Sequence, residues 1–229
     1  MAEREDDQLE RDVEAVLDAI GGQGLELSPE AHATMVALGK TIRFWNRKVN
    51  LISRKDIARL VTYHFCDSVS LLPILRPETG LSMLDVGGSN GLPGLVLTAA
   101  CPLLQVTICD SRRKREGFLR EACALLKGRA SYSIDRVDGE AFRRRNAGKF
   151  DLIVARAVTR LELLLKWCLP LTRVGGVIAA YKGSRCMDEV TRAEAYMWAH
   201  GVRVVTALGS PLASNCNHFR QFAIMATSG

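Results

Sequence analysis

Leu81-Ser-Met-Leu-Asp-Val-Gly-Gly-Ser-Asn-Gly-Leu-Pro-Gly94 decides the fold of this chain. The stretch is apolar up to Val86 and breaks into five residues that include three glycines, and an apolar run then continues to Ala100. This order predicts a strand, a tight glycine turn and a helix. Glycines permit positive φ angles and let a ligand approach the backbone closely, while the first N–H groups of a helix are free to bind a polar ligand.

A second predicted strand, Leu104–Cys109, ends at the acidic residue Asp110. Asp110 follows Gly87 at close to the roughly 20-residue offset that places a carboxylate on the ribose hydroxyls of a bound cofactor. A glycine turn alone is common at strand–helix connections. Together with Asp110, it favours a nucleoside-containing cofactor bound at the carboxyl ends of parallel strands.

The turn itself indicates which cofactor to expect. A dinucleotide site needs G-x-G-x-x-G so that the pyrophosphate can contact the helix N-terminus. Here Ser89 occupies the position of the second glycine, and Pro93 removes a backbone N–H from the turn. S-adenosylmethionine has a ribose but no phosphates, so we favour it over NAD.

The rest of the chain predicts an α/β fold, a doubly wound Rossmann-like sheet preceded by a small helical module. Short apolar runs alternate with helical patterns, which implies parallel strands joined by right-handed crossovers. We expect a helical module over residues 1–78 and a cofactor-binding domain over 79–229. The further predicted strands are 130–134, 150–155, 175–182, 202–208 and 219–226.

Three helices are predicted in the N-terminal module, from apolar residues at helical spacing. The first ends at Gly21-Gly22, the second begins with Ser28 as its N-cap and Pro29 as its first residue, and the third runs from about Asp56 to Leu75. In the third helix His64 and Asp67 are one turn apart, so the carboxylate is expected to pair with the imidazole. The segment Trp45–Asn50 mixes an aromatic ring with basic and amide groups, which favours a role beyond packing.

Composition narrows the class of protein. The chain has 31 Lys and Arg against 25 Asp and Glu, a formal net charge of +6 that suits a polyanionic partner. Its acidic first residues do not resemble a signal peptide, and no apolar run is long enough to span a membrane. The seven cysteines are scattered and never C-x-x-C, so we expect reduced core residues in a cytoplasmic protein, with no zinc or other metal site.

Two other classes of function compete with the cofactor-dependent enzyme. Gly87–Gly91 also matches the G-x-S-x-G elbow of α/β-hydrolases, with Ser89 as nucleophile and Asp188 and His200 or His218 downstream. However, only helices are predicted before the motif, so no preceding strand supplies an oxyanion-hole loop. A non-catalytic RNA-binding module would explain the basic runs 112–115 and 143–145 but leaves Gly87 and Asp110 without a role.

Among methyltransferases, missing motifs narrow the target. The fourth predicted strand is followed by Arg156-Ala157 and not by the Pro-Pro pair of adenine amino-methylating enzymes, and no paired cysteines offer a nucleophile for pyrimidine C5. Guanine N7 is an exposed lone-pair acceptor that needs no deprotonation before it attacks a methyl sulfonium. Catalysis then reduces to desolvation and in-line placement of the reactants.

At this point the chain resembles a known family along nearly its whole length, that of ribosomal small-subunit methyltransferase G, also called glucose-inhibited division protein B. The residues that carry the resemblance are Trp45-Asn-x-x-x-Asn50-Leu51, His64-Phe-x-Asp67-Ser68, Asp85-Val-Gly87, Gly91-Leu-Pro-Gly94, Asp110-Ser-x-x-Lys114-Arg115, Phe150-Asp151, Arg156-Ala157, Lys182-Gly183 and Arg220.

The resemblance implies N7 methylation of one guanine in small-subunit ribosomal RNA, with S-adenosylmethionine as donor. The RNA or the 30S particle is the implied partner of a cytoplasmic enzyme that we expect to be a monomer. In the family, loss of the protein is associated with low-level streptomycin resistance.

The resemblance also implies roles for individual residues. The implied cofactor contacts are Gly87 and Leu92 at the methionine end, Asp110, Ser111 and Arg112 at the ribose, Val137 and Asp138 at the adenine, and Arg156 beside cofactor and guanine. The implied border of the RNA pocket is His64, Lys182 and Arg220.

Two positions depart from the family pattern. Ser89 stands where a glycine is usual, which affects the expected contacts to the methionine end. Phe219-Arg220 replaces the usual Glu-Arg before the last strand, which affects the role of Arg220.

Overall fold

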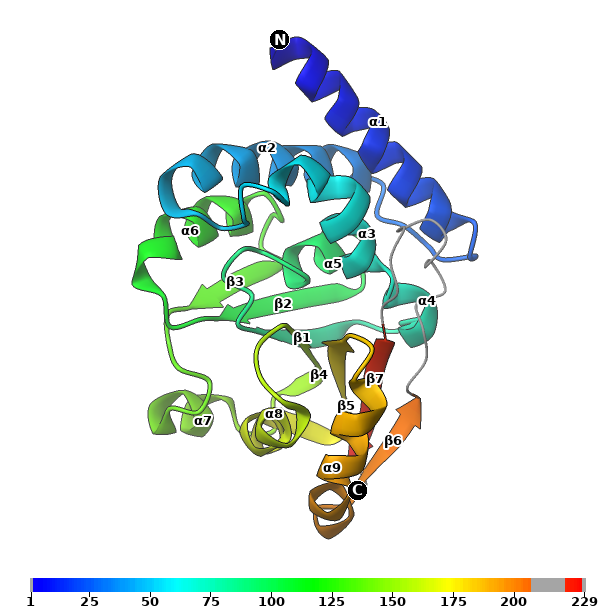
Figure 1. Cartoon of the computed structure of the whole chain (residues 1–229), viewed down its shortest axis with the longest axis vertical. Helices are drawn as coiled ribbons and strands as arrows, with labels where there is room; N and C mark the ends of the chain where they lie inside the picture. The colour runs from blue at the N-terminus through cyan, green and yellow to red at the C-terminus, as the bar shows by residue number, and fades with distance from the viewer. Residues whose placement is uncertain (1, 207–220, 228–229) are drawn as a thin grey trace.

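A mixed seven-stranded sheet forms the centre of the molecule. The computed structural model describes residues 2–206 and 221–227, and the strand order is β3-β2-β1-β4-β5-β7-β6 (Figure 1). The strands are β1 (Leu81–Val86), β2 (Leu104–Cys109), β3 (Ala130–Ser133), β4 (Phe150–Arg156), β5 (Thr172–Lys182), β6 (Val202–Thr206) and β7 (Gln221–Thr227).

Five neighbouring strands are parallel, and their register aligns their carboxyl ends. Val86 of β1 pairs with Cys109 of β2 on one side and with Ala155 of β4 on the other, while Cys109 pairs in turn with Ser133 of β3. The residues that follow these strands therefore meet at one edge of the sheet, where doubly wound sheets bind their ligands. The last two strands differ, because β7 runs antiparallel to both β5 and β6 and lies between them.

The N-terminal helices confirm the first predicted helix and correct the other two. α1 (Ala2–Gly21) ends where the glycine pair predicts. α2 (Ala31–Val49) begins after Glu30, not at Ser28, and the N-cap side chain makes no hydrogen bond. The predicted third helix is broken into η1 (Ile57–Arg59), the π-helical η2 (Leu60–Phe65), α3 (Cys66–Val69) and α4 (Leu72–Leu75).

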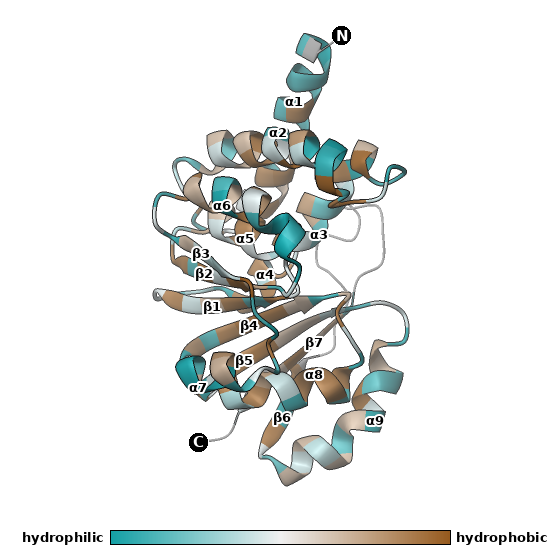
Figure 2. Cartoon of the chain, turned by 90° about the vertical axis from the view of Figure 1, so that its left-hand side faces the viewer, coloured by the Kyte–Doolittle hydropathy of each residue, from teal (hydrophilic) through white to brown (hydrophobic). Residues whose placement is uncertain are grey.

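Helices cover both faces of the sheet (Figure 2). The N-terminal helices lie on one face with α5 (Gly94–Ala100) and α6 (Glu116–Ala124), and α7 (Glu140–Asn146), α8 (Leu161–Cys168) and α9 (Cys186–Ala199) lie on the other. Short 3-10 segments precede α6 (η3, Arg113–Arg115) and follow α8 (η4, Leu169–Leu171). Successive strand residues alternate between the two cores, as with Met83 and Leu84 of β1.

The helical region and the sheet share one of these two hydrophobic cores. Leu9 of α1 and Met35 of α2 belong to the same buried cluster as Met83 of β1 and Leu152 of β4. Trp45 of α2 also donates a 2.8 Å hydrogen bond to Glu121 of α6, and its ring covers Gly117, where a Cβ would lie 2.6 Å from the indole. Trp45 therefore joins the helical region to the sheet layer; the division at residue 78 stays a prediction.

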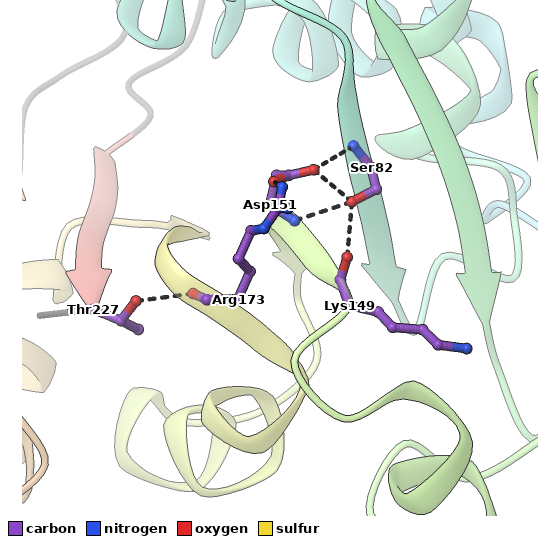
Figure 3. Close-up of polar contacts among 5 residues, drawn as sticks. All are labelled: Ser82, Lys149, Asp151, Arg173 and Thr227. Carbon is purple, nitrogen blue, oxygen red and sulfur yellow. Dashed lines mark hydrogen bonds and ion pairs between the residues drawn. The ribbon is translucent and has the colours of Figure 1, made fainter. Parts of the chain in front are cut away.

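A polar network ties the strands together at the edge opposite their carboxyl ends (Figure 3). Asp151 of β4 accepts hydrogen bonds from the Ser82 N–H (2.9 Å) and hydroxyl (2.6 Å) of β1, and forms an ion pair with Arg173 of β5. The Thr227 hydroxyl of β7 donates to the Arg173 carbonyl at 3.1 Å. Four strands are thereby fixed relative to one another at the end that carries no predicted ligand contacts.

Two general features complete the description. Among the described helices none is both long and apolar enough to cross a membrane. Cys66 is disulfide-bonded, which corrects the expectation of seven reduced cysteines. Cys101, Cys109, Cys123, Cys168 and Cys186 are buried free thiols.

Candidate active site

The glycine turn after β1 has the geometry that its sequence predicts. Gly87 has φ +74°, a conformation that L side chains rarely adopt, and a Cβ there would lie 2.9 Å from Val158. The Gly87 N–H donates to the Cys109 carbonyl of β2 at 2.9 Å, so the turn leaves the sheet in a fixed direction. The backbone of the turn is therefore held open toward the carboxyl edge of the sheet.

A buried carboxyl group supports the turn from behind. Asp85 of β1 is fully buried, and its Oδ2 accepts a 2.7 Å hydrogen bond from the Gly94 N–H at the start of α5. A Cβ at Gly88 would lie 2.2 Å from this carboxylate and one at Gly94 2.7 Å from it, so neither position accepts a side chain. Burial raises the pKa of Asp85 to about 7, because the charged form is poorly solvated there.

A cavity of about 600 Å³ opens at the carboxyl ends of β1, β2, β3 and β4. We call it the sheet-edge cavity. Among the predicted site residues it is lined by His64, Gly87, Leu92, Asp110, Ser111, Arg112, Val137, Asp138 and Arg156. Lys182 is not among the residues that line it. Arg220 and His218 lie outside the described residues.

Asp110 projects from the end of β2 into the sheet-edge cavity with its carboxylate oriented. The side chain is 8% exposed, and its Oδ1 accepts a 2.8 Å hydrogen bond from the Arg112 N–H two residues later. The same short turn places Ser111 and Arg112 in the cavity wall. These three residues, which the family resemblance groups at the ribose, therefore lie together in the cavity wall.

The wall after β3 contains a residue that the sequence analysis missed. Asp135 lines the sheet-edge cavity between the Ser133 hydroxyl, which donates to it at 2.5 Å, and Arg145, which forms an ion pair with it at 2.8 Å. Asp138 is paired with Arg136 through both carboxylate oxygens, at 3.0 and 2.8 Å. The signal for Asp135 is its position directly after the predicted strand 130–134, just as Asp110 directly follows the predicted strand 104–109.

Arg156 forms the buried ion pair of the site. Its Nη1 donates to Asp67 Oδ2 at 3.0 Å, with 9% of the arginine side chain exposed and none of the aspartate. The contact joins the end of β4 to α3 across 89 positions of sequence. The predicted pairing of His64 with Asp67 is therefore wrong, because the carboxylate faces the guanidinium instead.

His64 lies in the same wall without a hydrogen-bond partner. Both ring nitrogens are buried and unpartnered within the described residues, and the ring packs edge-on against Tyr63 at 4.9 Å. Burial, with a contribution from the nearby Arg156, lowers the pKa of His64 to about 4. The imidazole, which lines the sheet-edge cavity, is thus neutral at pH 7.

Lys182 at the end of β5 is engaged elsewhere. Its Nζ donates to the Thr159 carbonyl at 2.9 Å and to Glu189 of α9 at 2.7 Å, and its side chain is 10% exposed. These contacts fix the connection between β4 and α8. An RNA contact by Lys182 stays a prediction.

Ser89, the residue that departs from the family pattern, is held by an arginine. Its hydroxyl accepts a hydrogen bond from Arg115, which also donates to the Asn50 carbonyl at 3.2 Å. Arg115 thereby connects the glycine turn to the end of α2. The hydrolase alternative requires a histidine beside Ser89. Asp188 lies on α9 and His200 directly after it, and neither lines the cavity, while His218 lies outside the described residues.

Solved structures share this fold. Rv0187 from MTB, solved with its cofactor, superposes with a TM-score of 0.55 at 17% identity, over 85% of this chain and 89% of that one. A predicted O-methyltransferase from Agrobacterium tumefaciens superposes with a TM-score of 0.55 at 16% identity, over 71% and 81% of the two chains. The predicted Rossmann-like class I methyltransferase fold is confirmed.

Sequence relatives are closer. Proteins named ribosomal RNA small subunit methyltransferase G are 33% identical in Alkaliphilus oremlandii, over 84% of this chain and 82% of the relative, and 36% identical in Halalkalibacterium halodurans, over 72% and 70%. The family model described as rRNA small subunit methyltransferase G matches residues 31–214. This match extends from α2 to beyond β6 and includes every described wall of the cavity, so the chain belongs to the rRNA small subunit methyltransferase G family.

Proposed function

We propose that this protein transfers a methyl group from S-adenosylmethionine to N7 of a guanine in small-subunit ribosomal RNA. The observation that carries the proposal is the sheet-edge cavity, which brings together Gly87, Asp110 and Arg156 in a chain that belongs to this methyltransferase family. The three residues come from the ends of three adjacent strands.

The described residues of the cavity fit S-adenosylmethionine. Its volume of about 600 Å³ lies within the range of small-molecule sites. The oriented Asp110 carboxylate suits two ribose hydroxyls, and the open turn at Gly87 suits the close approach of the methionine end. Val137 offers apolar surface for the adenine. The Asp138 carboxylate, which already accepts from Arg136, would also accept a hydrogen bond from the adenine amino group.

The protein's contribution to the chemistry is placement and desolvation. The bound donor supplies an electrophilic methyl group on a sulfonium. Because guanine N7 attacks with a lone pair that is already free, the site needs no general base. His64, neutral at pH 7, and Arg156, which forms an ion pair with Asp67, both line the cavity that would receive the guanine.

The partner in this proposal is RNA. Naked small-subunit ribosomal RNA and the 30S particle are both candidates for the substrate. We further propose that the protein is monomeric and cytoplasmic and that its loss gives low-level streptomycin resistance.

The experiment is methyl transfer with a defined product. Purified protein is incubated with tritium-labelled S-adenosylmethionine and small-subunit ribosomal RNA or 30S particles from cells that lack the protein, and the RNA is digested to nucleosides. We expect label in 7-methylguanosine. Label in another nucleoside would contradict the assignment of guanine N7 as the target atom. If no RNA took up label, the whole proposal would be contradicted.

A further inference from the structure

A second cavity, of about 1060 Å³, lies next to the sheet-edge cavity on the N-terminal helical region. It is formed by α2 and the segment that follows it, and Ser53 lines both cavities. Its lining residues are Glu5, Arg43, Asn46, Arg47, Lys48, Asn50, Ser53, Arg54, Ile57 and Ala58. We call it the α2 groove.

The α2 groove is strongly basic. Four of its lining residues are cationic and one, Glu5, is acidic. Within the described residues none of the four cations forms an ion pair with a carboxylate, and Asp56, the one acidic residue between positions 43 and 59, is paired with Arg59 at 2.6 Å. Unneutralised cations around a recess attract a polyanion.

Two of the four groove cations, Lys48 and Arg43, contact neighbouring groups. Lys48 Nζ lies 4.0 Å above the ring of Phe44 and 5.0 Å from that of Trp45. Arg43 Nη1 donates to the Glu5 carbonyl of α1 at 3.2 Å.

A side-chain contact and a backbone turn set the path of the segment that follows α2. The Asn46 Oδ1 accepts a 2.8 Å hydrogen bond from the Ile52 N–H, so the segment after α2 has a set path. Asn50, in the left-handed conformation with φ 48°, turns the chain at this point. The groove is therefore a formed recess.

We propose that the α2 groove binds the phosphate backbone of the RNA that flanks the target guanine. This inference rests on the proposed function. A nucleotide whose base enters the sheet-edge cavity must carry its neighbouring phosphates along one border of that cavity. The border at Ser53 leads directly to Arg47 and Arg54, both exposed and without a carboxylate partner within the described residues.

The test is the double variant Arg47→Ala/Arg54→Ala, measured by RNA binding at several salt concentrations. The log of the association constant falls with the log of salt by roughly 0.7 for each phosphate contacted on single-stranded nucleic acid. We expect the slope of the variant to be shallower by about 1.4, for two lost contacts. We also expect a higher KM for RNA at nearly unchanged kcat, and an unchanged calorimetric affinity for S-adenosylmethionine.

The matched control is Arg143→Ala/Arg144→Ala on α7. It removes the same charge from exposed arginines on the opposite face of the sheet, far from α2 (Figure 1). We expect its salt slope and KM to equal those of the wild type.

Three results would overturn the inference. If both double variants lost the same RNA affinity, binding would depend only on the net charge of the protein. A groove variant with wild-type RNA binding, or one that loses binding to anionic phospholipid vesicles but not to RNA, would show that the groove has another ligand. In all three cases the wild-type protein still methylates RNA, so the proposed function stands. If the wild-type protein neither bound nor methylated RNA, the proposed function would be contradicted as well.

Discussion

At the scale of single residues, the carboxylate of Asp110 carries the proposed contact with the ribose of the cofactor. Asp110→Ala removes an oriented, nearly buried acceptor from the end of β2. Hydrogen bonds to a charged group contribute about 1.5–3 kcal/mol, so we expect S-adenosylmethionine to bind about ten- to a hundredfold more weakly, measured by calorimetry. Asp188→Ala, an acidic residue on α9 outside the cavity wall, is the control. Unchanged affinity in Asp110→Ala would remove the ribose assignment.

Arg156 combines an observed structural role with a proposed functional one. Because Asp67 is fully buried and faces Arg156, Arg156→Ala is expected to lower the free energy of unfolding by about 3–5 kcal/mol, as for other buried ion pairs that lose one partner. Methyl transfer, measured well below the melting temperature on protein shown to be folded, should fall further than this instability explains.

Arg156→Lys is the control for charge, because it keeps a cation beside Asp67 without the planar guanidinium. We expect it to recover part of the stability and little of the activity. Full activity in Arg156→Ala would exclude Arg156 from the site.

At the scale of elements, the glycine turn depends on what stands behind it. A Cβ at Gly88 would overlap the Asp85 carboxylate, which is itself held by Gly94 and cannot retreat. Gly88→Ala should therefore displace the turn, weaken S-adenosylmethionine binding at least tenfold and lower stability by about 1–3 kcal/mol. Gly80→Ala, where the nearest atom to the new Cβ is 4.0 Å away, should match the wild type in both measurements.

Sequence patterns predict these elements well where the signal is local. β2 was predicted at its observed bounds, and the turn after β1 follows from its own glycines. The predicted third helix was wrong because its apolar spacing does not reveal the π-helical Leu60–Phe65 or the breaks after it. The prediction of Ser28 as the N-cap is wrong. Its carbonyl accepts a 2.9 Å hydrogen bond from the Ala31 N–H, which closes a turn before α2 begins.

Long-range pairings lay beyond prediction from the sequence alone. The antiparallel position of β7 between β5 and β6 is a matter of strand pairing, which no pattern within β7 itself reveals. Likewise, His64 and Asp67 are near neighbours in sequence, whereas Asp67 and Arg156 are 89 positions apart and form the actual pair. The one-turn spacing of His64 and Asp67 predicted the wrong partner for Asp67, because tertiary packing brings Arg156 to its carboxylate.

At the scale of the whole molecule, two buried titratable groups act on stability in opposite directions. The pKa of Asp85 rises from 3.8 to about 7 on folding, so the folded state holds its proton more tightly and stability falls as the pH rises through this window. The pKa of His64 drops from 6.5 to about 4, so the unfolded state holds that proton more tightly and stability rises with pH between these values. Between about pH 4 and 6.5 the two effects oppose each other.

Single variants separate the two effects in urea unfolding measured at a series of pH values. Asp85→Asn keeps an oxygen to accept from the Gly94 N–H and leaves His64 to act alone, so its stability should rise with pH from about 4 to 6.5 by roughly 1 kcal/mol per pH unit. The stability of His64→Gln should instead fall as the pH rises, and the fall should continue to about pH 7. His200→Gln, at an exposed position on the Tyr196 ring, should follow the wild type. Parallel curves for all four proteins would show that neither group changes its pKa on folding.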